Sequence, residues 1–155
     1  AYGGLNFTAL KGGLSDGIDS IDFGRGLIGG GFLGYNHQAG DVVIGGEVVV
    51  NTGKARVYGE GVNITYVADL RARIGRVVGD HFVYLSGGVS ALQTSGAIRG
   101  KRVPLANVGA GIETPLGEAL FFGADYTHRT TDVRVFGAPI TVGYHNIGAR
   151  IGYRF

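Results

Sequence analysis

Charged side chains recur at alternate positions in several segments of this sequence, each next to apolar neighbours. Side chains at alternate positions of a β-strand point to one face of the sheet. Opposite charges collected on an enclosed face form ion pairs that offset their own desolvation. The sequence therefore predicts an interior charge network, which we assign to Glu47, Asp69, Arg71, Arg73, Glu113, Asp125 and Arg150. The same residues are also compatible with a narrow, gated ionic path.

Other residue types capable of chemistry lack the spacing that catalysis or metal binding requires. The sequence has no cysteine, and its four histidines show no H-x-x-x-H spacing. His128 has no serine two to four residues away, and no G-x-S-x-G motif occurs. Asp16, Asp19 and Asp22 lack the spacing and the closing glutamate of an EF-hand loop. We expect no enzymatic activity, no metal and no cofactor.

Two segments show most clearly which elements must position the charges. From Ile147 to Phe155, one set of alternate residues is wholly apolar and the other contains only glycine and arginine. From Val62 to Gly75, a longer alternation places Asp69, Arg71 and Arg73 opposite an apolar face. Strands in soluble sheets average about five or six residues, whereas a tilted strand needs about 9–11 to cross a bilayer. The lengths favour strands that span a membrane.

The alternation predicts eight strands joined by connections of two kinds. The strands are 2–10, 27–37, 42–50, 62–75, 82–92, 105–114, 120–128 and 147–155. Short turns lie at 38–41, 79–81 and 115–118, and longer connections at 11–24, 51–59, 93–102 and 129–141. We therefore expect an all-β fold: an eight-stranded antiparallel up-and-down transmembrane β-barrel with short periplasmic turns and longer extracellular loops.

The direction of the apolar faces decides between a membrane barrel and a soluble, lipocalin-like ligand-binding barrel. Glycines such as Gly34, Gly109 and Gly111 fall on the polar face. A narrow lumen needs small residues to make room for long arginine side chains, whereas a solvated surface does not. Aromatic residues of the apolar face lie near the strand ends, as in the girdles of membrane barrels. These features favour polar faces turned inward.

Five segments of the sequence carry a likeness to a known family: Gly34–Gly40 followed by Gly46-Glu47, Leu70–Gly75, Tyr84–Val89, Gly109–Glu113 and Gly152–Phe155. They resemble the opacity-type, porin-like small outer-membrane proteins of Gram-negative bacteria. The sequence departs from the family at His37, where an aromatic residue is usual, and in having no tryptophan. The resemblance implies an eight-stranded barrel with a mainly structural or surface role. It also implies that the C-terminal aromatics Tyr153 and Phe155 are recognised by the barrel-assembly machinery.

Composition and loop charge define the expected location and partners. The formal net charge of +2 does not suggest nucleic-acid binding. We expect residues 1–155 to form one domain in the bacterial outer membrane, as the mature form after removal of a signal peptide. Its surroundings would be outer-membrane lipid, with Arg99, Lys101 and Arg102 contacting lipopolysaccharide phosphates or another anionic partner. Small outward residues would allow other envelope proteins to approach: Gly29, Gly31, Gly46 and Gly87.

The expected function is that of a structural or surface-interaction protein with a filled, charge-paired lumen. An eight-stranded barrel has an interior just large enough to be filled by side chains. A narrow porin-like channel for small ions or solutes is the first alternative, and a soluble lipocalin-like barrel is the second.

Overall fold

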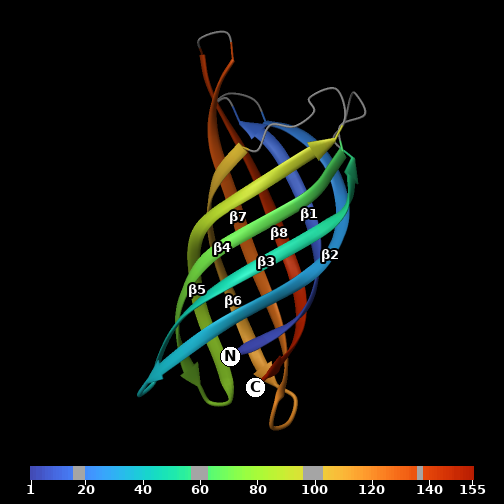
Figure 1. The fold of residues 1–155 in the computed structure, drawn as a ribbon. Coiled ribbons are helices and arrows are strands. Elements are labelled where there is room, and N and C mark those ends of the chain that lie inside the picture. Colours follow the sequence, from blue (N-terminus) through green and yellow to red (C-terminus); the bar gives the residue numbers. More distant parts are fainter. Residues whose placement is uncertain (16–19, 57–62, 96–102, 136–137) are drawn as a thin grey trace.

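The computed structural model describes residues 1–15, 20–56, 63–95, 103–135 and 138–155. These residues form eight antiparallel strands that close into a barrel (Figure 1). The strands are β1 (Tyr2–Ser15), β2 (Ser20–Ala39), β3 (Val42–Arg56), β4 (Asn63–Val78), β5 (His81–Ser95), β6 (Val103–Pro115), β7 (Leu120–Val135) and β8 (Ala138–Arg154). Each strand pairs with its neighbours in sequence and β8 pairs with β1, which confirms the predicted up-and-down fold. No helix within the described ranges is long and apolar enough to span a membrane.

The strands extend further from the short turns than the sequence pattern predicted. The predicted strand 2–10 continues to Ser15, and the predicted strand 120–128 continues to Val135. Backbone hydrogen bonding continues beyond the point at which apolar alternation ends, so hydropathy marks the edge of the lipid-facing band rather than the end of the strand. Much of the predicted connections 11–24, 51–59, 93–102 and 129–141 is therefore strand.

At the opposite end of the barrel, tight turns join consecutive strands. In the β2–β3 and β4–β5 hairpins, two residues connect the paired strand ends, and the first is a glycine with positive φ: Gly40 at 63° and Gly79 at 61°. Positive φ is required by the primed turns that match the twist of paired strands. Figure 1 shows both chain ends beside these turns, at the lower end of the view.

The strand register explains how residues far apart in sequence meet inside. Tyr2 pairs with Gly34, Gly34 with Glu47 and Glu47 with Arg71. Continued through β5, β6, β7 and β8, this row returns to β1 at Gly12, ten residues beyond its start. Such a stagger requires strands tilted by about 35–45° to the barrel axis. The tilt brings inward side chains of non-adjacent strands to the same depth.

Where its side chains are described, the exterior of the barrel is largely apolar. Large hydrophobic side chains point outward from every strand, for example Leu5, Leu33, Leu70, Leu85 and Ile151. Charged side chains of the same strands are buried inside. Water does not stabilise an apolar belt of this extent, whereas acyl chains do. The structure therefore excludes the soluble, lipocalin-like alternative, because the apolar faces point away from the lumen.

Candidate functional site

Glu47 on β3 is the centre of an ion-pair network inside the barrel. Its carboxylate, which is 1% exposed, accepts hydrogen bonds from Arg71 Nε at 2.8 Å and from Arg73 Nη1 at 2.9 Å. Arg150 Nη2 from β8 donates to the same carboxylate, as does the Tyr2 hydroxyl at 3.0 Å. One carboxylate thus meets three guanidinium groups from two strands.

Two further carboxylates balance the excess positive charge around Glu47. Arg73 Nη2 donates to Glu113 on β6 at 2.5 Å, and Arg71 Nη2 donates to Asp125 on β7 at 2.9 Å. Arginine forms such charge-assisted bonds in a fixed planar geometry, which orients both partners. The network therefore connects β3, β4, β6, β7 and β8 through side chains alone.

A second charged group lies nearer the loop end of the lumen. Arg129 on β7 donates from Nε to Asp69 Oδ1 on β4 at 3.0 Å, and from Nη2 to Asp69 Oδ2. Its Nε also lies 3.1 Å from the Ser90 hydroxyl, and its guanidinium lies 5.5 Å from the Tyr144 ring centroid. The predicted connection 129–141 placed Arg129 outside the strands, which was wrong, because β7 continues past His128 and turns Arg129 inward.

The structure places all seven residues of the predicted network inside the barrel, and Arg129 joins them. Together they make four carboxylates and four buried guanidinium groups. Arg154 adds a fifth guanidinium at the short-turn end, where its Nη2 lies 3.6 Å from Glu113 Oε2. The sequence pattern missed Arg129, although Asp125, Thr127 and Arg129 share one parity along β7. Extending the series of inward positions past the last apolar residue of β7 would have identified Arg129.

An apolar layer packs against the Glu47 network near the short turns. The rings of Tyr2, Phe32 and Phe121 lie 6.1 to 6.2 Å apart between centroids, and Phe121 is 0% exposed. Inward glycines lie against large side chains of neighbouring strands. We predicted that these glycines accommodate arginine stems, which is wrong at Gly34 and Gly111, where an added Cβ would meet the side chains of Tyr2 and Tyr84. An arginine stem is the neighbour at Gly123, where an added Cβ would lie 2.8 Å from Arg150 Cγ. At Gly152 the neighbour is instead the Phe121 ring.

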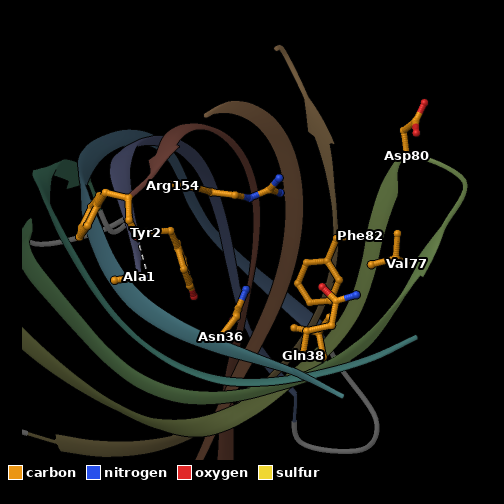
Figure 2. Close-up of a pocket in the computed structure, with 10 residues that line it drawn as sticks. Ala1, Tyr2, Asn36, Gln38, Val77, Asp80, Phe82 and Arg154 are labelled. Atoms are coloured by element: carbon orange, nitrogen blue, oxygen red, sulfur yellow. Dashed lines mark hydrogen bonds between the residues drawn. The ribbon is translucent and has the colours of Figure 1, made fainter. Parts of the chain in front are cut away.

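Beyond this layer, a cavity of about 350 Å³ lies at the short-turn end. Its lining includes Tyr2, Asn36, Phe82 and Arg154. Figure 2 shows the side chains of Tyr2, Asn36 and Arg154 pointing into this opening, whereas Asp80 points away from it. Arg154 also lies over the Phe121 ring, 4.9 Å from its centroid. The cavity is thus a vestibule that reaches Tyr2 of the aromatic layer.

Comparisons with known proteins give the fold a precedent. No protein-family model matches the sequence, and no curated protein matches it. Neisserial surface protein A (NspA) is 13% identical, with 99% of this chain and 97% of that chain covered and a TM-score of 0.59. The outer membrane protein AlkL, solved in lipid bilayers, is 14% identical, with 99% and 89% covered and a TM-score of 0.55.

This chain has the fold of a small outer-membrane barrel. At such low identity the likeness is one of fold alone, so it assigns no ligand or partner.

The remaining predicted site residues are the basic residues of one long connection and the C-terminal aromatics. Arg99, Lys101 and Arg102 fall outside the described residues, as do Asp16 and Asp19. Tyr153 and Phe155 are exposed at the short-turn end, where their rings stack with centroids 6.5 Å apart. In the part of the chain that the structure describes, no three His, Cys, Asp or Glu side chains gather as a metal site.

Histidine is the residue type for which sequence reasoning failed most clearly. The four histidines are scattered in sequence, but the register of β7 and β8 makes His128 and His145 direct partners. Spacing along one strand carries no signal for this pair, because the two residues belong to different strands.

Proposed function

We propose that this chain is a bacterial outer-membrane barrel that acts through its surface, as a structural or surface-interaction protein with a plugged lumen. The observation that carries the proposal is the Glu47 network, in which arginines from β4 and β8 meet one buried carboxylate. In this proposal the barrel anchors and binds rather than catalyses. Its apolar belt contacts outer-membrane lipid, and its outer rim contacts lipopolysaccharide.

The location is supported by the exterior and by the two similar structures. A continuous apolar belt needs hydrocarbon around it, and closed β-barrels of this kind satisfy their backbone hydrogen bonds without water. NspA is described as a surface protein and AlkL as an outer membrane protein. The opacity-type resemblance of Gly34–Gly40 and Gly152–Phe155 points to the same compartment.

The plugged lumen is supported by the packing around Glu47. Arg73 and Arg150 are almost fully buried, and their guanidinium groups lie 3.8 Å from the ring centroids of Tyr84 and Phe32. A permeating ion would have to separate these groups from their carboxylates. Breaking one partner from a buried ion pair costs about 3–5 kcal/mol. The network therefore favours a closed lumen over the narrow porin-like channel.

Single-channel recording in planar bilayers tests this proposal. The wild-type barrel, verified as folded by its heat-modifiable electrophoretic mobility, is expected to give no reproducible open level. The matched variant Glu47→Ala/Arg73→Ala/Arg150→Ala removes the centre of the network and is expected to give frequent conductance steps. A stable open level in the wild type that disappears in Arg71→Ala or Arg73→Ala would contradict the proposal and support an ionic path.

The surface role needs a separate measurement, since a silent lumen alone does not establish it. Proteins crosslinked to the barrel in native outer membranes are compared with those crosslinked to an unrelated barrel of similar size and abundance. We expect a reproducible envelope or extracellular partner specific to this chain. An identical set of partners for both barrels would contradict a specific surface interaction.

A further inference from the structure

Three polar aromatic side chains lie together on the outward face of β7 and β8. They are Tyr126 and His128 on β7 and His145 on β8, and we call them the Tyr-His-His cluster. His128 and His145 are cross-strand partners, and Tyr126 lies two residues before His128 on the same face. None of the three takes part in the interior network.

The cluster lies where the apolar belt ends on these strands. On the turn side, the outward residues are apolar, as at Phe122 on β7 and Ile151 on β8. On the loop side, the next outward residues are Thr130 and Gly143, which pair with each other. The cluster therefore lies at the boundary between acyl chains and headgroups on the loop side of the barrel, where polar ligands have access.

Within the cluster, two neighbours compete for one nitrogen atom, His145 Nδ1. His128 Nδ1 lies 3.3 Å from His145 Nδ1, and the Tyr126 hydroxyl lies 2.5 Å from the same His145 atom. A neutral imidazole nitrogen carries either one hydrogen or one lone pair. His145 Nδ1 can therefore form one good hydrogen bond here. The Tyr126 hydroxyl has the shorter contact, so the two Nδ1 atoms face each other without a proton well placed for both.

We propose that His128 and His145 bind one late divalent transition-metal ion, such as Zn²⁺, Cu²⁺ or Ni²⁺, through their Nδ1 atoms. Zinc binds imidazole nitrogen at about 2.0–2.1 Å with tetrahedral geometry, which separates two ligand nitrogens by about 3.3 Å. The distance between the two Nδ1 atoms is 3.3 Å. Histidine χ2 torsions are broad, so both rings can turn toward a shared ion.

The surroundings favour access and set the metal selectivity. Opposite Thr130 stands Gly143, where an added Cβ would lie 3.2 Å from His128 Cε1, so the glycine leaves space for the ring. The two histidines provide nitrogen ligands, and the Tyr126 hydroxyl provides an oxygen close to them. Imidazole suits Zn²⁺, Cu²⁺ and Ni²⁺, whereas Ca²⁺ and Mg²⁺ need carboxylate or carbonyl oxygens. The remaining coordination positions face outward and are open to water or to headgroup phosphate.

Isothermal titration calorimetry with ZnCl₂ and NiCl₂ tests the site. The sample is the intact folded barrel in nonionic detergent, free of lipopolysaccharide. One ion is expected per chain, with no uptake of Ca²⁺ or Mg²⁺ at equal concentration. His128→Ala and His145→Ala are each expected to weaken Zn²⁺ affinity at least tenfold. Both positions face outward, so heat-modifiable mobility should confirm that the variants remain folded. The barrel should also stay monomeric during titration, which excludes an ion shared between two chains.

His37→Ala and His81→Ala are the matched controls, because both histidines are exposed in strands outside the cluster. Each control is expected to keep wild-type affinity. Unchanged Zn²⁺ binding in His128→Ala and His145→Ala would overturn the proposal, as would an equal loss in a control. Failure of the wild type to bind at millimolar Zn²⁺ would also overturn it.

Discussion

Arg129 holds Asp69 through two hydrogen bonds inside the barrel, although the residues lie on non-adjacent strands and 60 positions apart in sequence. Both side chains are nearly fully buried. The pair is independent of Glu47 and lies further toward the loop end. It therefore gives a measure of what one buried ion pair contributes to this fold.

Replacing Arg129 by alanine is expected to destabilise the barrel by about 3–5 kcal/mol, because Asp69 would remain as a buried carboxylate without a cation. Equilibrium urea unfolding in lipid vesicles, followed by tyrosine fluorescence or circular dichroism, measures the change. The matched control is Arg76→Ala, because Arg76 pairs with Asp41 at 3.6 Å through side chains that are 69% and 78% exposed. Exposed pairs contribute about 0–1 kcal/mol. Equal losses in both variants would contradict the assignment.

Gly152→Ala is expected to destabilise the barrel by about 1–3 kcal/mol through overpacking. An added Cβ would lie 2.6 Å from Phe121 Cε1, and the Phe121 ring is fully buried. The control is Gly46→Ala on the outward face of β3, where no atom lies within 4 Å of an added Cβ. Combining Gly152→Ala with Phe121→Leu should recover part of the loss in the same urea unfolding measurement. No recovery would indicate a cause other than the ring.

The sequence predicted the faces of the strands correctly, because a strand with one lipid face and one lumen face alternates with period two. The local pattern alone therefore assigns Leu70 to the lipid face and Arg71 to the lumen face. Strand ends were less predictable: around Arg129 the outward positions are occupied by His128 and Thr130, which are not apolar. Partners across the barrel were not predictable, since the meeting of Glu47 with Arg150 depends on strand stagger. That stagger is a property of the closed barrel and not of any one segment.

Leu70→Arg tests which way the apolar faces point. Leu70 is 59% exposed on the outward face near the middle of β4. An arginine at the bilayer midplane costs about 2–4 kcal/mol, falling to about 0–1 near the interface. Val78→Arg on the same strand is the control, because Val78 is 61% exposed but lies beside the β4–β5 turn. Unfolding in vesicles should show a clear loss for Leu70→Arg and little for Val78→Arg.

Glu47→Gln tests whether charge balance, rather than packing, holds the network together. The amide keeps the volume of the side chain but leaves Arg71, Arg73 and Arg150 with too little negative charge. Loss of one partner from a buried pair costs about 3–5 kcal/mol. Adding Arg150→Met removes one cation while keeping an unbranched side chain, so the double variant should be more stable than the sum of the single losses predicts. Residues that share a network show such non-additivity, of about 0.5–3 kcal/mol. Strict additivity in urea unfolding would mean that Glu47 and Arg150 stabilise the barrel independently, and the ion pair would not be the cause.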